Sequence, residues 1–138
     1  MNEKTKLKKW SLAKWKKEFW KTFSKYIKLR DKGICYTCKV RCSGKNAHAG
    51  HFRPAGACGL WLYFHEDNVH CQCLKCNIHL QGNQYEYGKR LGEEKVKMLD
   101  KGKIEHKDLQ YSKKDYCELI KKYELKIQSL KQTYEVKL

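Results

Sequence analysis

The sequence has 138 residues, with 31 Lys and Arg against 15 Asp and Glu, which gives a formal net charge of +16. This length allows one modest domain or a small core with appended helices, and it excludes a barrel enzyme or a two-domain dinucleotide-binding enzyme. The longest unbroken apolar run, residues 60–64, is far shorter than the ~20 residues that cross a bilayer, so we expect no membrane span.

The charge and the cysteines indicate the kind of partner and the compartment. A large positive excess favours a polyanion, because each Lys or Arg that reaches a phosphate releases condensed counterions. A solvated, lysine-rich surface is the alternative. The basic amino-terminal region lacks the apolar stretch and cleavage site of a secretory signal, so we expect a cytoplasmic protein. Reduced cysteines in that compartment bind metals more often than they form disulfides.

The first predicted element is an amphipathic helix over about residues 7–29, within a basic segment at 1–32. Its apolar residues recur at steps of three and four, which is the period of one helix face. That face packs in the core or against a second subunit, while the lysines between stay in solvent and can bind DNA. The apolar face comprises Leu12, Trp15, Phe19, Phe23 and Ile27, and the DNA-binding candidates are Lys14, Lys17 and Lys21.

Residues 33–100 form the predicted core, where short pieces are broken by Gly, Cys and His. A helix is expected from about Cys76 to Leu91, because Gly92 supplies a stop signal, and a short helix follows over 93–99. Such a loop-rich stretch has little apolar material, so we expect its fold to depend on a metal.

The last segment, 101–138, is predicted to be one helix that begins at a capping box over residues 112–115. Its apolar positions recur at steps of three and four. This seam either folds onto the first helix or pairs with its copy in a dimer. The positions are Leu119, Tyr123, Ile127, Leu130 and Tyr134.

Two C-x-x-C pairs, Cys35 with Cys38 and Cys73 with Cys76, supply the four soft ligands of a tetrahedral structural zinc. The 34 residues between the pairs exceed the usual zinc-ribbon spacing, so other structure must lie there. A redox role is the alternative, but the chain has no thioredoxin-like βαβ pattern. The remaining cysteines have no knuckle spacing and are expected to be buried thiols: Cys42, Cys58, Cys71 and Cys117.

The residues between the pairs carry a resemblance. His51 has a Pro three residues on, Asn68 precedes the second pair, and Asn77 directly follows its last Cys. This pattern resembles HNH, or ββα-metal, nucleases. The stretches AGHFRPAG and NVHCQCLKCNIHLQGN are similar to the lambda NinG/Rap family of phage recombination endonucleases, over residues 34–99. The resemblance implies an α+β fold with a zinc-stapled HNH core, flanked by N- and C-terminal amphipathic helices.

Phosphodiester hydrolysis needs an activated water and a cation that neutralises developing charge. We expect His51 to be the general base, because a neutral imidazole can accept a proton near pH 7. The resemblance implies that Asn77 binds catalytic Mg²⁺ or Mn²⁺ and that Asn68 holds the loop that carries the histidine. The alternatives are a core or zinc-bound His51 and an Asn77 that merely caps a helix.

The second cation ligand departs from the family pattern. Many HNH enzymes place Asp immediately before the base, but here that position is Gly50. His48 is the nearest replacement, and an imidazole ligand favours Mn²⁺ or a transition ion over Mg²⁺. Asp67, His70 and His79 are competing candidates.

The resemblance implies a phage-encoded, structure-selective DNA endonuclease that resolves branched recombination intermediates such as a Holliday junction or D-loop in the host cell. Arg53 and Lys75 are candidates to steady the scissile phosphate, with plain surface charge as the alternative. Two symmetric cuts favour a homodimer. The alternative function is a non-catalytic zinc-knuckle DNA-binding accessory protein, which the missing carboxylate at Gly50 keeps open.

Overall fold

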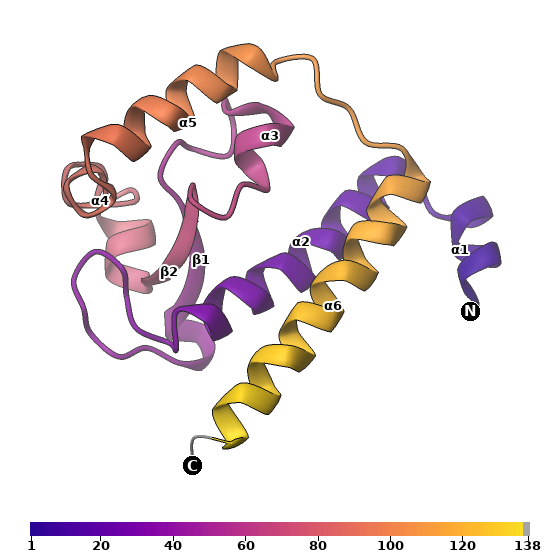
Figure 1. Ribbon diagram of the computed structural model, residues 1–138, viewed down its shortest axis with the longest axis horizontal. Helices are drawn as coiled ribbons and strands as arrows, with labels where there is room; N and C mark the ends of the chain where they lie inside the picture. Colours follow the sequence, from indigo (N-terminus) through magenta and orange to yellow (C-terminus); the bar gives the residue numbers. More distant parts are fainter. Residues whose placement is uncertain (137–138) are drawn as a thin grey trace. The chain divides into compact units, whose positions relative to one another are not determined.

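The computed structural model describes residues 1–136 and has an α+β fold of helices and a two-stranded sheet (Figure 1). The chain divides into two compact units, one formed by residues 1–26 with the chain from 110 on, the other by residues 27–109. The two terminal segments thus contribute to one unit, and the predicted core segment lies in the other. No helix within residues 1–136 combines the length and apolar character that a bilayer span requires.

The first unit begins with two helices, α1 (Glu3–Lys9) and α2 (Leu12–Arg30). The prediction of one continuous helix over 7–29 was therefore wrong. Ser11 is the physical reason, because its Oγ accepts a hydrogen bond from the Lys14 N–H at 3.1 Å. Serine in this position satisfies a free amide at the start of a helix and favours a new helix over continuation of the preceding one.

Helix α6 (Lys113–Val136) begins at the predicted capping box. The Ser112 Oγ accepts from the Asp115 N–H at 3.1 Å, and the Asp115 carboxylate accepts from the Ser112 N–H at 2.8 Å. The apolar seam folds onto α2, one of the two predicted arrangements, and the ribbons of α2 and α6 run side by side (Figure 1). Tyr123 of α6 contacts three aromatic residues of α2. Its ring lies with centroids 5.2–5.6 Å from those of Phe19, Phe23 and Tyr26.

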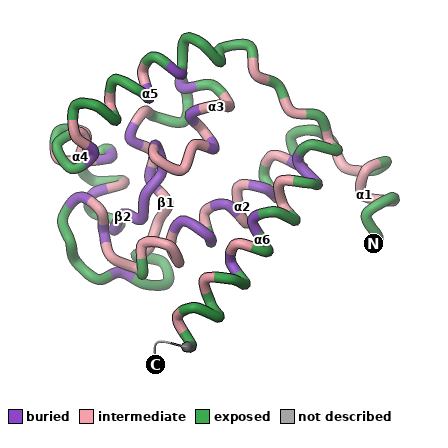
Figure 2. Tube along the Cα trace, in the orientation of Figure 1, coloured by how far each residue is buried: buried purple, intermediate pink, exposed green. Residues whose placement is uncertain are grey.

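In the second unit, β1 (Ala47–His51) pairs antiparallel with β2 (Val69–Cys73), and His51 lies opposite Val69. All five residues of β2 are buried, as the purple trace of this strand shows (Figure 2). The connection between the strands contains the short helix α3 (Gly59–Tyr63). This topology places His51 at the end of β1, where the chain leaves the sheet.

The chain after β2 forms the π-helix η2 (Lys75–His79) and then α4 (Gln84–Leu91). A continuous helix over 76–91 was expected, and this was wrong. Gln81 and Asn83 have positive φ, as does the glycine between them, and a left-handed stretch ends a right-handed helix. The turn returns the chain toward the sheet, where the Gly82 N–H donates to the Cys76 carbonyl at 2.8 Å.

Helix α5 (Glu93–Glu105) runs beyond its predicted end at residue 99. Gly102 lies inside it, and a Cβ there would be only 2.0 Å from a ring atom of Trp61, so the glycine allows close packing on α3. The apolar core of this unit lies between α3, α4 and α5, and comprises Phe52, Cys58, Leu62, Tyr87, Leu91 and Leu99.

The cysteines outside the two C-x-x-C pairs are buried, as predicted: Cys42, Cys58, Cys71 and Cys117. Cys42 and Cys71 lie together, with their sulfur atoms 3.6 Å apart. Burial raises the pKa of Cys71 to about 12, so this thiol stays protonated at neutral pH. Among the described residues, these four cysteines belong to no cluster of metal ligands.

Candidate functional site

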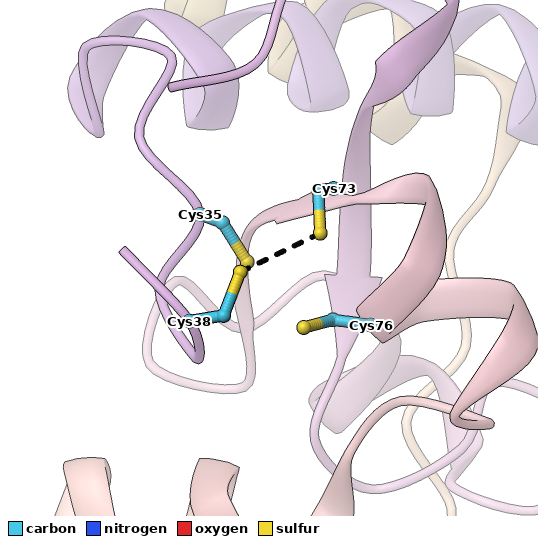
Figure 3. A group of neighbouring side chains, drawn as sticks. All are labelled: Cys35, Cys38, Cys73 and Cys76. Atoms are coloured by element: carbon cyan, nitrogen blue, oxygen red, sulfur yellow. Dashed lines mark hydrogen bonds between the residues drawn. The ribbon is translucent and has the colours of Figure 1, made fainter. Parts of the chain in front are cut away.

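The sulfur atoms of Cys35, Cys38, Cys73 and Cys76 all lie within 4.8 Å of one another (Figure 3). The first pair belongs to the turn between the bridged residues Ile34 and Arg41, and the second pair joins the end of β2 to η2. Cys38 and Cys73 have their sulfurs 3.6 Å apart. Four thiolates at this spacing can hold a zinc ion, so the predicted grouping of the two pairs is confirmed.

The surroundings shift the pKa values of Cys35 and Cys38 in opposite directions. Burial by itself raises the pKa of Cys35. Hydrogen bonds from the Thr37 hydroxyl, 3.4 Å away, and from nearby backbone amides outweigh burial and lower this pKa to about 6. Burial and hydrogen bonds with neighbouring thiols raise the pKa of Cys38 to about 12. The Asn83 amide donates to the Cys76 sulfur at 3.6 Å. Because a metal ion binds the thiolate form of cysteine, metal binding would release the protons that these thiols hold.

His51 is half-buried at the end of β1, and its Nε2 lies 2.9 Å from the Tyr63 carbonyl oxygen. A carbonyl only accepts hydrogen bonds, so Nε2 carries the proton and Nδ1 of the neutral ring keeps its lone pair. The ring also contacts the Tyr63 ring, with centroids 4.8 Å apart. His51 is therefore outside the four-cysteine cluster and outside the apolar core.

His51 and Asn77 line the same open cleft, whose volume is about 390 Å³. Asn77 belongs to η2, directly after the cysteine ligand Cys76, while His51 ends β1. The pairing of the two strands thus brings together two residues 26 positions apart in the sequence. The cleft is completed by Pro54, Ala55, Ile78, Gln81, Gly82 and Gln84.

His48, in the middle of β1, contacts Asn77 of η2. Its Nε2 lies 3.0 Å from the Lys45 carbonyl oxygen, and its Nδ1 lies 3.0 Å from the Asn77 Nδ2. Nε2 must donate to the carbonyl, so Nδ1 of the neutral ring accepts from Asn77. Both ring nitrogens of His48 are used, and the contact leaves the Asn77 Oδ1 free to face away from His48.

Asn68 is fully buried and ties together the two ends of the connection between the strands. Its Oδ1 accepts from the Arg53 N–H at 2.8 Å, and its Nδ2 donates to the Leu62 carbonyl at 3.0 Å and the Arg53 carbonyl at 3.3 Å. These contacts fix the backbone two residues after His51, which is what the role expected for Asn68 requires.

Asn68→Ala is expected to lower the free energy of unfolding by about 2–4 kcal/mol, because it removes the three hydrogen bonds of a fully buried side chain, including the acceptor for the Arg53 N–H. The measurement is urea unfolding of the zinc-loaded protein. Asn68→Asp should also destabilise the fold, because it keeps the acceptor for the Arg53 N–H but turns a buried carboxyl group toward the Leu62 and Arg53 carbonyl oxygens. An alanine variant within 0.5 kcal/mol of the native protein would contradict this role.

The two candidate phosphate contacts of the second unit differ. Arg53 forms a double hydrogen bond with Asp100, at 2.8 Å on both arms, and its guanidinium lies over the Phe52 ring. Its charge is thus already partly neutralised. Lys75 is exposed on η2, one position before the ligand Cys76.

The lysines predicted to bind DNA lie on α2 in the first unit. Lys14, Lys17 and Lys21 are all exposed. Glu18 pairs with the first and third of them, at 3.0 and 3.2 Å, so Lys17 presents its charge with less local compensation.

The competing ligand candidates lie in other settings. His70 is buried and stacked on Tyr36, with ring centroids 3.8 Å apart, and its Nδ1 lies 3.1 Å from the Tyr87 hydroxyl. Asp67 pairs with Lys95 at 3.5 Å, and His79 is exposed at the end of η2. None of the three lines the cleft with His51.

A hydrogen-bonded chain behind β1 was missed by the sequence analysis. The Tyr87 hydroxyl donates to the Gly50 carbonyl at 2.7 Å, so its oxygen accepts from His70. Burial is the largest cause that lowers the pKa of His70, to about 4, and the Arg30 charge adds to it. These two hydrogen bonds therefore link neutral His70, through Tyr87, to the backbone carbonyl of Gly50, the residue before His51.

The lowered pKa of His70 predicts that the protein loses stability in acid. An unfolded histidine takes up a proton near pH 6.5, but folded His70 does so only near pH 4, so stability that is present above pH 6.5 is lost as the pH falls toward 4. The expected loss from His70 is about 3 kcal/mol. His70→Asn, which keeps a donor for Tyr87, should flatten the pH dependence of unfolding by that amount. Parallel pH profiles of variant and native protein would contradict it.

The fold and site together define a small α+β protein with a four-cysteine cluster that could hold a metal ion and a cleft lined by a histidine and an asparagine. The family model described as Bacteriophage Lambda NinG protein matches residues 1–135, and this chain belongs to that family. The expected resemblance to the lambda NinG family is thus confirmed.

Three phage relatives show how much of the family protein is present. Protein ninG of Escherichia phage 933W is 30% identical over 138 residues, which cover 94% of this chain and 66% of the relative. Protein ninG of Escherichia phage lambda is 31% identical over 113 residues, covering 76% and 54%. Protein ninG of Salmonella phage P22 is 30% identical over 135 residues, covering 94% and 65%. The chain thus spans less than two thirds of each relative's length. No solved structure is significantly similar.

Proposed function

We propose that this protein is a metal-dependent endonuclease of the HNH type that cuts branched recombination DNA in the phage-infected host cell. The observation that carries the proposal is the cleft shared by His51 and Asn77. His51 supplies a ring nitrogen that can accept a proton, and Asn77 supplies an amide oxygen that can bind a hard cation.

The order of elements supports the HNH assignment. Strands β1 and β2 are followed by the helical turn η2, and the four-cysteine cluster joins the turn before β1 to the end of β2. His51 ends β1 and Asn77 lies in η2, so a ββα arrangement of this kind would hold both residues on a zinc-stabilised frame.

In the proposed reaction, the Tyr63 carbonyl fixes the His51 ring through Nε2, and Nδ1 accepts a proton from the attacking water. Asn68 fixes the backbone that follows His51, and His48 orients the Asn77 amide. A bound divalent cation would neutralise charge on the phosphate and the leaving 3′ oxygen. The products are 5′-phosphate and 3′-hydroxyl ends.

The cation fits the residues present. Asn77 directs its amide nitrogen to His48, so its carbonyl oxygen is left for a ligand. Amide oxygens are hard donors of the type that Mg²⁺ and Mn²⁺ prefer. Exposed Lys75 lies between Cys73 and Cys76 and can steady the phosphate, whereas Arg53 would first have to exchange its contact with Asp100.

Family membership and the net charge of +16 support branched DNA as the substrate. Two symmetric cuts across a four-way junction need two active sites, so we propose a homodimer on DNA. Light scattering of the protein with and without a four-way junction tests the assembly. A monomer in both samples would remove the basis for paired cuts.

The function is tested with a labelled four-way junction and its separate duplex arms, in Mg²⁺ and in Mn²⁺. Asn77→Ala is the inactive control, since it removes the amide but keeps the neighbouring ligand Cys76. Cutting of the junction alone, lost in Asn77→Ala at equal zinc content and equal DNA binding, is the expected result. Equal cutting of junction and arms would retain the nuclease and reject the branched specificity.

A second function is favoured by one observation, the lack of a side chain at Gly50. Without a carboxylate before His51, the fold can serve as a non-catalytic DNA-binding accessory protein. Tight binding of the junction without cutting in either ion would select this function over the nuclease.

A further inference from the structure

The position beside His51 that lacks a side chain is filled from the neighbouring strand. A Cβ built on Gly50 would lie 1.9 Å from the Gln72 Oε1 and 2.9 Å from the Asn77 Oδ1. The Cβ of an Asp at position 50 would therefore overlap the Gln72 amide oxygen. The space is occupied by an oxygen that comes from β2 and not from β1.

The Gln72 amide is fixed in one orientation. The side chain is fully buried, and its Nε2 donates to the Thr37 hydroxyl at 3.1 Å and to the Gly82 carbonyl at 2.9 Å. Both amide hydrogens are thus used on one side, and Oε1 must point to the other. Within residues 1–136, this buried oxygen has no hydrogen-bond partner, which is uncommon because an unsatisfied buried acceptor is destabilising.

The second oxygen is oriented by His48. The Lys45 carbonyl requires a proton on the His48 Nε2, so Nδ1 of the neutral ring takes the Asn77 amide hydrogen. The Asn77 Oδ1 then faces the Gln72 Oε1. Two acceptor oxygens directed at one place repel each other unless a cation or a donor lies between them.

We propose that Gln72 and Asn77 bind the divalent cation together through their amide oxygens, with Gln72 in place of the carboxylate that Gly50 lacks. The assignment rests on the nuclease proposed above. The Gln72 and Asn77 oxygens lie 1.9 and 2.9 Å from the same Cβ position and are therefore no more than 4.8 Å apart. A single Mg²⁺, Mn²⁺ or Ca²⁺ ion, with bonds to oxygen of about 2.0–2.6 Å, can bridge oxygens at such a separation. One ion can therefore contact both.

The assignment gives His48 a different role from the one expected from the sequence. His48 is a positioning residue that acts through Asn77, and Gln72 is the ligand. Two neutral oxygens hold a cation less strongly than a carboxylate would, because ligand charge sets much of the affinity. The phosphate of the bound DNA is then the charged ligand that completes the site, so cation affinity should rise when DNA binds.

The ligand assignment is tested by Mn²⁺ binding to the full, zinc-loaded chain, followed by the loss of the electron paramagnetic resonance signal of free Mn²⁺. Gln72→Met keeps the size of the side chain and removes the oxygen. We expect it to weaken Mn²⁺ binding at least tenfold. Gln81→Met is the matched control, since it makes the same exchange at an exposed position in the cleft that Asn77 lines, and it should leave the affinity unchanged.

A second pair of variants tests the ligand assignment even where Gln72→Met does not fold. Gln72→Ala empties the space beside Gly50, and Gly50→Asp/Gln72→Ala puts a carboxylate into it. Gly50 has no positive φ that would exclude a side chain. The double variant should bind Mn²⁺ at least tenfold more tightly than Gln72→Ala, at equal zinc content. Equal affinity of the two, or native affinity in a folded Gln72→Met, would overturn the assignment.

These measurements separate the ligand from the reaction. Mn²⁺ binding that depends on Gln72, in a protein that cuts no DNA, would retain the cation site and reject the nuclease. Cutting with native Mn²⁺ affinity in Gln72→Met would retain the nuclease and reject Gln72 as a ligand. Absence of Mn²⁺ binding to the native protein, with and without a four-way junction, would reject both.

Discussion

Removal of zinc is expected to unfold residues 27–109. The four sulfur atoms lie within 4.8 Å of one another, and without a cation only weak contacts between thiols would join the two C-x-x-C turns. Binding of zinc to such sites supplies about 10–16 kcal/mol, which matches or exceeds the 5–15 kcal/mol that holds a typical domain folded. The measurements are zinc content per chain and thermal unfolding with and without a chelator.

Cys76→Ser should reproduce the effect of the chelator, because it removes one ligand. Cys117→Ser is its matched control: Cys117 is also buried, but it lies in the other unit and outside the cluster. The control should keep one zinc per chain. A purified native protein without zinc, or a reduced zinc-free protein that melts at the native temperature, would contradict the structural role of the metal.

His51→Ala is expected to lower the rate of junction cleavage by about 10²- to 10⁴-fold, the usual contribution of a general base. Its Nε2 is committed to the Tyr63 carbonyl, so the Nδ1 lone pair is the group that the substitution removes from the cleft. Junction binding should stay within twofold of the native value. The measurement is a single-turnover cleavage rate with a binding assay on the same samples.

Added imidazole distinguishes a base from a structural residue, because it can enter the space left by the ring and restore part of the rate. His79→Ala is the control, since His79 is exposed and does not line the cleft. A His51→Ala rate within tenfold of the native rate would contradict the assignment. Loss of zinc or of DNA binding in this variant would point to a structural role for His51.

Local chemistry made part of the structure predictable. The two C-x-x-C pairs predict their own cluster, because each turn can present two sulfurs to one ion wherever the rest of the chain lies. The capping box at Ser112 also depends only on neighbouring residues. Helix ends within 7–29 and 76–91 were missed. The signals were present: Ser11 is a good N-cap, and Gly82 with Asn83 favours a left-handed turn.

The pairing within the cleft could not be predicted from local pattern. Strands β1 and β2 are short and rich in His, Cys and Gly, so their alternation carries little information on register. The expectation that His51 meets Asn77 came from family resemblance. Gln72 was missed because a glutamine in a short strand is unremarkable until the strand is known to be buried. Its signal was a polar residue between Cys71 and Cys73.

The Thr37 hydroxyl has one proton, and its oxygen accepts a hydrogen bond from the Gln72 amide. The proton is therefore available to the cysteine sulfurs beside it, of which Cys35 is 3.4 Å away. A negative thiolate draws the hydroxyl proton, the hydroxyl draws the amide hydrogen, and the polarised amide carries more negative charge on Oε1. Thiolates that hold a metal ion in this cluster would thus polarise, through two hydrogen bonds, an oxygen on the far side of the glutamine.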